Sequence, residues 1–290
     1  MTKDNGEGEA MVVYFNGVYQ PKSEVRISPD DRGFLMADGV YEVVAAVRGR
    51  WFRLDAHLER LARSLREIKL HGIEADALGP VAAELLRRND LTEAYAKLYI
   101  QITRGVAPRR HAFPHERVEP TVYATVTCFE PPEARWAEGV SAITVPDTRW
   151  ARCDIKSIAL LPNVLASQAA AEAGAYEALF VRDGVVTEGS HTSALFVMDG
   201  EVLTHPGDPH ILPGVTRGWA MEACRDLGLP VRETEVAIDA LLDAEEVMLL
   251  GTTSGVMPVV EVNGHPIGEG VPGAITRALQ DAFREAMGLV

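Results

Sequence analysis

A chain of 290 residues is long enough for about two domains. Hydrophobic residues make up 47% and charged residues 24%, which is typical of globular proteins and excludes a disordered, collagen-like or disulfide-scaffolded chain. The formal net charge of −14 disfavours nucleic-acid binding, because an acidic surface repels phosphate backbones.

The cysteines and the amino-terminal segment favour a soluble, cytoplasmic protein. Cys128, Cys153 and Cys224 are far apart and form no metal-ligand pattern, so we expect free thiols in a reducing compartment and no bound metal. Residues 1–10 are polar and acidic and lack the apolar core of a signal peptide, so we expect a flexible tail. No apolar stretch approaches the roughly 20 residues of a membrane span, and we expect no membrane partner.

Residues 11–130 have the pattern of a small α+β domain. The pair Asn16-Gly17 between two apolar runs predicts a hairpin, because it supplies positive φ angles. Apolar residues at spacings of 3, 4 and 3 between positions 58 and 68 predict a helix with Asp55 as its N-cap, and Pro80 opens a second helix. Strands are expected at residues 12–15, 18–20, 39–47, 51–53, 94–103 and 121–127.

Residues 131–134 are expected to be a linker, because two prolines between charged residues neither pair in a sheet nor continue a helix. Residues 135–290 follow as a larger domain, in which Asp183-Gly184 and Asp199-Gly200 predict two hairpins. The expected strands are 140–144, 178–181, 247–250 and 256–262, and the expected helices are 163–173, 215–227 and 274–287. The fold class is therefore α+β or mixed α/β, in two unequal lobes.

Lys156 and Glu188 are the candidate catalytic residues. Uncharged, largely apolar residues follow Lys156, and loss of hydration lowers the pKa of an amine and makes it nucleophilic. The alternative is an ordinary lysine at a strand end with its amine in water. Glu188 follows a strand and precedes a glycine and several hydroxyl side chains, a setting for anion binding or for a simple turn.

Two turns could bind phosphate. Residues 212–217 predict a loop entering a helix, where free backbone N–H groups attract anions. Residues 251–255 form a second turn of this kind after an apolar strand. Glycine and threonine in either turn could also serve helix capping alone.

Together these segments resemble the fold-type IV pyridoxal-phosphate enzymes: D-amino-acid aminotransferases, branched-chain aminotransferases and aminodeoxychorismate lyases. The resemblance covers residues 12–288 and implies a small N-terminal α+β lobe, a larger C-terminal pseudo-barrel lobe that binds the cofactor, and a homodimer with its active site between the lobes. The motifs occur in the family's order: Phe15-Asn16-Gly17, Asp38-Gly39-Val40-Tyr41-Glu42, His57-Leu58-Glu59-Arg60-Leu61, the segment around Lys156, Glu188-Gly189, residues 212–217 and Thr252-Thr253-Ser254.

The resemblance implies a role for each site residue. Lys156 is expected to be the Schiff-base lysine and the proton shuttle. Glu188 is expected to pair with the pyridine nitrogen of pyridoxal 5'-phosphate and to keep it protonated. The remaining cofactor-binding residues are Arg60, Leu212, Val215, Thr216 and Thr252.

Residues 104–114 resemble the loop with which D-amino-acid aminotransferases hold the substrate α-carboxylate. Arg109 and His111 fill its binding positions. The resemblance also implies that this loop reaches the partner's site in the dimer. Tyr41 and Thr253 complete the expected substrate contacts. Two departures are Arg110, an extra charge within the loop, and a histidine at 191, where serine is common.

The sequence therefore predicts a pyridoxal-phosphate-dependent transaminase. We expect it to move an amino group between a D-amino acid of the alanine, glutamate or aspartate type and a 2-oxo acid by a ping-pong mechanism. A branched-chain L-amino-acid aminotransferase and an aminodeoxychorismate lyase are the alternatives within the family. A non-catalytic pyridoxal-phosphate-binding protein is a third alternative.

Overall fold

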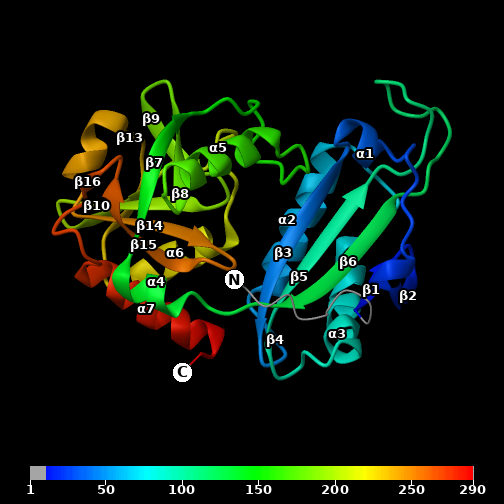
Figure 1. The fold of residues 1–290 in the computed structure, drawn as a ribbon, viewed down its shortest axis with the longest axis horizontal. Coiled ribbons are helices and arrows are strands. Elements are labelled where there is room, and N and C mark those ends of the chain that lie inside the picture. Colours follow the sequence, from blue (N-terminus) through cyan, green and yellow to red (C-terminus); the bar gives the residue numbers. More distant parts are fainter. Residues whose placement is uncertain (1–10, 290) are drawn as a thin grey trace. The chain divides into compact units, whose positions relative to one another are not determined.

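The structure, a computed structural model, describes residues 11–289, so the predicted flexible tail at 1–10 lies outside the described residues. The chain divides into two compact units (Figure 1). Unit 1 contains the chain up to Glu130 together with Ile155–Ala159, and unit 2 contains Pro131–Asp154 and the chain from Leu160 onward. Residues 155–159, which the sequence analysis assigned to the second domain, thus belong to unit 1.

Unit 1 is built on a six-stranded sheet in the order β2-β1-β6-β5-β3-β4, with every neighbouring pair antiparallel. Its strands are β1 (Val12–Phe15), β2 (Val18–Pro21), β3 (Gly39–Val47), β4 (Arg50–Trp51), β5 (Tyr95–Thr103) and β6 (Thr121–Cys128). Its helices are α1 (Arg32–Met36), α2 (Leu54–Glu67) and α3 (Leu78–Arg88). These elements confirm the predicted hairpin and five of the six predicted strands. The strand predicted at 51–53 is the two-residue strand β4, which ends at Trp51.

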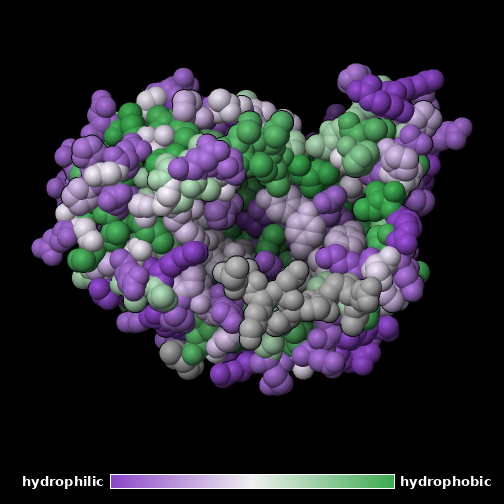
Figure 2. All heavy atoms as spheres, viewed as in Figure 1, coloured by the Kyte–Doolittle hydropathy of each residue, from purple (hydrophilic) through white to green (hydrophobic). Residues whose placement is uncertain are grey.

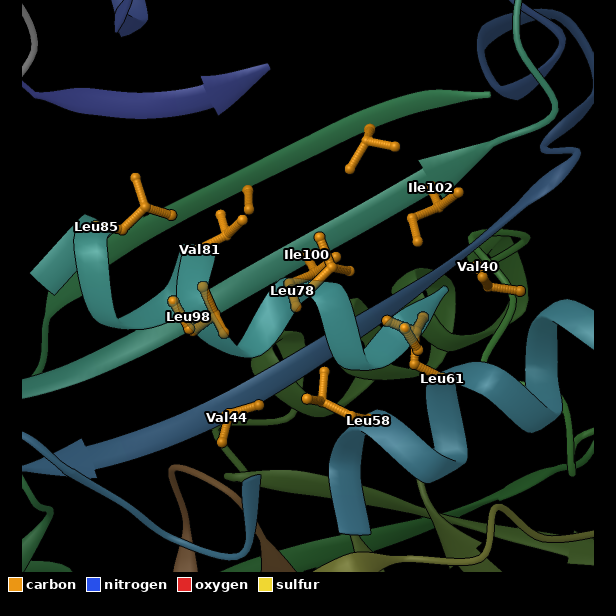
Figure 3. Close-up of a cluster of buried hydrophobic side chains, with 14 of the residues drawn as sticks. Val40, Val44, Leu58, Leu61, Leu78, Val81, Leu85, Leu98, Ile100 and Ile102 are labelled. Atoms are coloured by element: carbon orange, nitrogen blue, oxygen red, sulfur yellow. The ribbon is translucent and has the colours of Figure 1, made fainter. Parts of the chain in front are cut away.

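The core of unit 1 lies between this sheet and helices α2 and α3 (Figure 3). Alternate residues of a strand point to opposite faces, so Val40 and Val44 of β3 pack with Leu58 and Leu61 of α2. The same alternation puts Tyr41 on the other face. Helices α2 and α3 therefore hold β3 by one face, and the opposite face of this strand carries Tyr41.

Two helix boundaries differ from the sequence prediction. Arg53, in the left-handed region at φ 51°, is the residue before α2, so Asp55 lies within the first turn and is not the N-cap. There its negative carboxylate still interacts favourably with the positive end of the helix dipole. Pro80 is the third residue of α3, because a short 3₁₀ turn at Ala75–Ala77 runs directly into this helix. Proline is tolerated in a first turn, where its missing N–H has no partner to lose.

Unit 2 contains a ten-stranded mixed sheet in the order β12-β11-β10-β14-β15-β7-β8-β9-β13, with β16 beside β15. Its strands are β7 (Val140–Pro146), β8 (Glu177–Arg182), β9 (Val185–Gly189), β10 (Ser193–Met198), β11 (Glu201–Thr204), β12 (Val231–Glu233), β13 (Val236–Ala237), β14 (Glu246–Gly251), β15 (Gly255–Val262) and β16 (His265–Pro266). Its helices are α4 (Glu133–Glu138), α5 (Leu161–Glu172), α6 (Val215–Asp226) and α7 (Ala274–Met287).

Both hairpins predicted for unit 2 are present, β8–β9 around Asp183-Gly184 and β10–β11 around Asp199-Gly200. The strand pairs β7–β8, β7–β15 and β11–β12 are parallel and the others antiparallel, which confirms the mixed fold class. Over residues 11–289, we find no helix with the length and apolar character needed to cross a membrane.

Candidate active site

Lys156 is positioned by strand β3. The segment Ile155–Ala159 runs beside the start of this strand, where Ser157 forms a bridge with Val40 and the Tyr41 N–H donates to the Lys156 carbonyl at 3.0 Å. The Lys156 amine lies 3.5 Å from the Tyr41 hydroxyl and 4.5 Å from the centre of its ring. The structure thus brings together a predicted catalytic residue and a predicted substrate-binding residue that are 115 positions apart.

Arg60 is held by the carboxylate of Glu42, a motif residue for which the sequence predicted no role. Its guanidinium donates to both oxygens of Glu42, at 3.0 and 2.6 Å, and Glu42 is fully buried. His57, one turn earlier on α2, places Nδ1 at 3.0 Å from the same carboxylate. Burial raises the pKa of Glu42, but Arg60 and His57 outweigh it and hold this pKa well below its usual range. Burial lowers the pKa of His57, which favours its neutral form.

Arg109 and His111 lie on the loop between β5 and β6. Both are exposed, and within residues 11–289 no hydrogen bond or ion pair joins either side chain to another residue. The structure therefore does not bring them into contact with Tyr41. Their side chains are available to an external carboxylate.

Glu188 lies within β9 itself, and not after a strand as the sequence suggested. Its carboxylate accepts hydrogen bonds from Arg149 at 2.5 Å and from the Leu212 N–H at 3.1 Å. Arg149 also donates to Asp147 at 2.9 Å. Burial lowers the pKa of Arg149, but Asp147 and Glu188 outweigh burial and raise this pKa above its usual value. The guanidinium therefore stays charged beside Glu188.

The amino-terminal end of α6 confirms the predicted loop entering a helix. Gly214 is the N-cap of the helix and has no side chain that could cap the first amides. A Cβ atom on Gly214 would lie 2.5 Å from the Ser193 hydroxyl, so a larger residue there would require the Ser193 side chain to shift. Thr216 is buried in the first turn, and the backbone N–H groups of Val215 and Thr216 have the orientation that binds anions.

The turn at Gly251–Gly255 is a hairpin between β14 and β15, and not a second helix entry, because Gly251 and Gly255 pair across the two antiparallel strands. It contains Thr252 and Thr253. The Trp136 indole donates to the Ser254 carbonyl at 2.7 Å, and the Tyr176 and Ser254 hydroxyls lie 3.2 Å apart. These contacts from outside the hairpin fix its shape.

The histidine that departs from the family pattern has a buried partner. Nδ1 of His191 lies 2.9 Å from a carboxylate oxygen of Glu177, which is fully buried on β8. Ser190 and Thr192 donate to the same carboxylate at 2.5 and 2.9 Å. Burial raises the pKa of Glu177, but His191 and these hydroxyls bring it below its usual value. His191 is thus tied into the turn that follows Glu188.

The residue types present fit the cofactor that the resemblance implies. Unit 1 offers an amine, Lys156, and a fixed cation, Arg60. Unit 2 offers a carboxylate, Glu188, and the free amides at the start of α6. A phosphorylated pyridine aldehyde needs these four kinds of group. The sequence assigned no role to Glu42, although it lies in a motif, or to Asp147, Arg149 and Glu177, which lie in none. Each acts through a partner that becomes adjacent only in the fold.

Comparison with known proteins establishes the family. The model of the amino-transferase class IV family matches residues 39–262. The chain belongs to the class IV aminotransferases, the fold-type IV enzymes.

Several relatives match over nearly their full length. A D-alanine aminotransferase of Bacillus licheniformis is 40% identical over 278 residues, which cover 96% of this chain and 97% of that protein. The D-alanine aminotransferase of Staphylococcus haemolyticus is 39% identical over 274 residues, covering 94% and 96%. Among solved structures, the branched-chain amino acid aminotransferase of Escherichia coli has a TM-score of 0.88 at 24% identity, covering 96% of this chain and 94% of that one.

Glu42→Gln tests the buried pair that holds Arg60. The variant keeps the shape of the side chain but leaves the guanidinium charge unmatched, which costs about 3–5 kcal/mol of unfolding free energy at pH 7. The folded-state pKa of Glu42 lies below the ordinary value of 4.5, so its stabilisation is complete above that pH and is lost as the pH falls. The difference in unfolding free energy between the wild type and Glu42→Gln should therefore become smaller below about pH 4.5.

The measurement is denaturant unfolding of the cofactor-free protein from pH 3.5 to 8. Glu84→Gln is the matched control, because Glu84 pairs with Arg87 and Arg88 on the surface of α3 and should matter little. A stability difference for Glu42→Gln that does not depend on pH would contradict the assignment.

Proposed function

We propose that this protein is a D-amino-acid transaminase that exchanges an amino group between a D-amino acid of the alanine, glutamate or aspartate type and a 2-oxo acid in a ping-pong reaction. The observation that carries the proposal is the loop bearing Arg109 and His111, whose side chains are uncommitted within the described chain. The likeness to D-alanine aminotransferases over nearly the whole sequence supports it.

The cofactor is pyridoxal 5'-phosphate. When bound, it supplies an aldehyde that accepts the amino group and a ring that withdraws electrons from the substrate Cα. Lys156 binds the cofactor covalently and moves the proton from the substrate Cα. Glu188, which accepts a hydrogen bond from Arg149, pairs with the ring nitrogen and holds its proton.

Arg60 neutralises the phosphate, and the backbone amides and hydroxyls of unit 2 complete its binding. Leu212 packs against the ring, and its N–H orients Glu188. Thr253 contacts the substrate. The other residues that bind the phosphate are Val215, Thr216 and Thr252.

The position of the substrate carboxylate determines which enantiomer reacts. A guanidinium, an imidazole and the hydroxyl of Tyr41 hold this carboxylate on one side, while Lys156 acts on one face. A D-amino acid then directs its Cα–H bond at the lysine. An L-amino acid must exchange its carboxylate and side chain, which leaves Arg109 without its anionic partner and lowers the rate by about two to three orders of magnitude.

A homodimer completes the proposal, with Arg109 and His111 delivered to the partner's site. Three large apolar residues of α5, Leu161, Val164 and Leu165, are exposed, and Figure 2 shows a hydrophobic area over this helix. Apolar patches of this kind are typical of protein–protein contacts. We also propose a cytoplasmic location, supported by three free cysteines, of which Cys153 and Cys224 are buried.

Lys156→Ala tests the covalent attachment. Borohydride reduction should fix the cofactor to the wild-type chain and to a Lys97→Ala control, whose missing lysine is exposed on β5. It should fail to fix the cofactor to Lys156→Ala. The measurement is intact mass followed by peptide mapping, and an adduct found on another lysine would reject the role of Lys156.

Arg109→Ala tests the substrate class. The wild type should form pyruvate from D-alanine and 2-oxoglutarate, and kcat/KM should fall about 100-fold or more in the variant as the charged partner is lost. Arg117→Ala, an exposed arginine in the same loop, is the matched control and should change little.

Two outcomes would overturn the proposed function. Faster turnover of L-leucine than of D-alanine by the wild type would indicate a branched-chain aminotransferase. Release of pyruvate from aminodeoxychorismate without any amino acceptor would indicate the lyase.

A further inference from the structure

The loop that carries Arg109 and His111 is mostly exposed between residues 108 and 119. This segment, residues 105–120, is called the carboxylate loop below, and it extends beyond the ends of β5 and β6 (Figure 1). It borders a cavity of about 1130 Å³, whose walls include Tyr14, Ile73, Phe113, His115, Arg117 and Val122. Side chains in a close-packed core hold one another in place, whereas a loop over a cavity depends on individual contacts.

Both ends of the carboxylate loop are fixed to the sheet. Gly105 has a φ of +90°, and a Cβ atom there would lie 2.1 Å from the Glu119 carbonyl, so the two ends approach each other closely. Asp31, the N-cap of α1, accepts hydrogen bonds from Thr103 at 2.8 Å and from Thr121 at 2.6 Å. These contacts determine where the loop leaves the sheet, but they do not reach Arg109 or His111.

Arg32 reaches further along the loop. Its Nη1 donates to the Arg110 carbonyl at 2.6 Å, and its Nε donates to Asp38 at 2.7 Å. The Arg32 side chain is only 3% exposed. Arg110 stands between the two residues expected to hold the substrate carboxylate, so this hydrogen bond fixes the backbone in the middle of that pair.

Arg104 forms the second connection. It donates to Asp38 at 2.8 and 2.9 Å, and its guanidinium lies 3.8 Å from the centre of the Phe113 ring. Asp38 is thus shared by two arginines that contact the loop on either side of His111. Burial raises the pKa of Asp38, but Arg104 and Arg32 bring it below its usual value, so the carboxylate stays charged.

We propose that the cluster of Arg32, Asp38 and Arg104 positions the carboxylate loop and thereby sets the affinity for the substrate carboxylate. The inference rests on the proposed function, in which Arg109 and His111 bind that carboxylate. Arg32 and Arg104 are positioning residues, because their effect on substrate passes through the loop.

Arginine is required at position 32 by geometry as well as by charge. The planar guanidinium of Arg32 donates to Asp38 from Nε and to the Arg110 carbonyl from Nη1. A lysine has the same charge but a single ammonium on a flexible stem, so it cannot keep both contacts in the same geometry. Arg32→Lys therefore separates the hydrogen bond to the loop from the buried charge.

We expect Arg32→Lys to raise the KM for D-alanine and for 2-oxo acids about 10- to 100-fold, with a much smaller change in kcat, because a small displacement of a substrate-positioning group has effects of this size. Phe113→Ala removes the ring contact with Arg104, leaves every buried charge in place, and should raise KM in the same direction by less. Arg117→Lys, an exposed change in the same loop, is the control and should leave KM unaltered.

A second measurement does not require turnover. Hydrogen–deuterium exchange of peptides from residues 106–118 should be faster in Arg32→Lys and Phe113→Ala than in the wild type, while peptides from β5 stay unchanged. In an Arg109→Ala background, Arg32→Lys should add little to the KM, because residues that act through one another are not additive.

The outcomes separate the two proposals. A wild type that prefers L-leucine to D-alanine rejects the proposed function, whatever the loop does. If the wild type is active on D-alanine and Arg32→Lys has wild-type KM and wild-type exchange, the positioning role is wrong. If the effects of Arg32→Lys and Arg109→Ala on KM are fully additive, the positioning role is also wrong, because Arg32 then acts independently of Arg109.

Discussion

The candidate site depends on the pairing of buried arginines with buried carboxylates. A buried charge without a partner is strongly destabilising, so each guanidinium that the fold encloses needs an anion beside it. Arg60 has Glu42, Arg32 and Arg104 share Asp38, and Arg149 has Asp147 and Glu188. The pairs of Arg104 with Asp38 and of Arg149 with Glu188 join positions far apart in the sequence. Each group of paired charges lies next to a residue expected to bind cofactor or substrate.

This pairing explains how an acidic chain can hold two anionic groups. The net charge of −14 describes the whole surface, whereas phosphate and carboxylate respond to nearby groups. Glu42 fixes the direction of Arg60 without removing its charge, and Arg149 fixes the direction of the Glu188 carboxylate. The residues proposed for chemistry are therefore held by other charged side chains, and the sheets and helices bring those partners together.

Much of the fold was predictable from local patterns. Asn16-Gly17 indicated the hairpin, and the Val- and Tyr-rich segment at 39–47 indicated a strand, because tight turns and strands favour these residue types. Ordered motifs led to Lys156, Glu188 and the start of α6. The structural context of the turn at 251–255, the assignment of residues 155–159 and the partners of the site residues were not predictable, because they depend on long-range pairing between strands.

The most direct test of this account follows the Cα proton of alanine by NMR in deuterium oxide, with the holoenzyme and no added 2-oxo acid. If Lys156 moves this proton while the carboxylate is held at Arg109 and His111, D-alanine should lose its α-proton signal at least about 100 times faster than L-alanine. Equal rates for the two enantiomers, or faster exchange of L-alanine, would contradict the account.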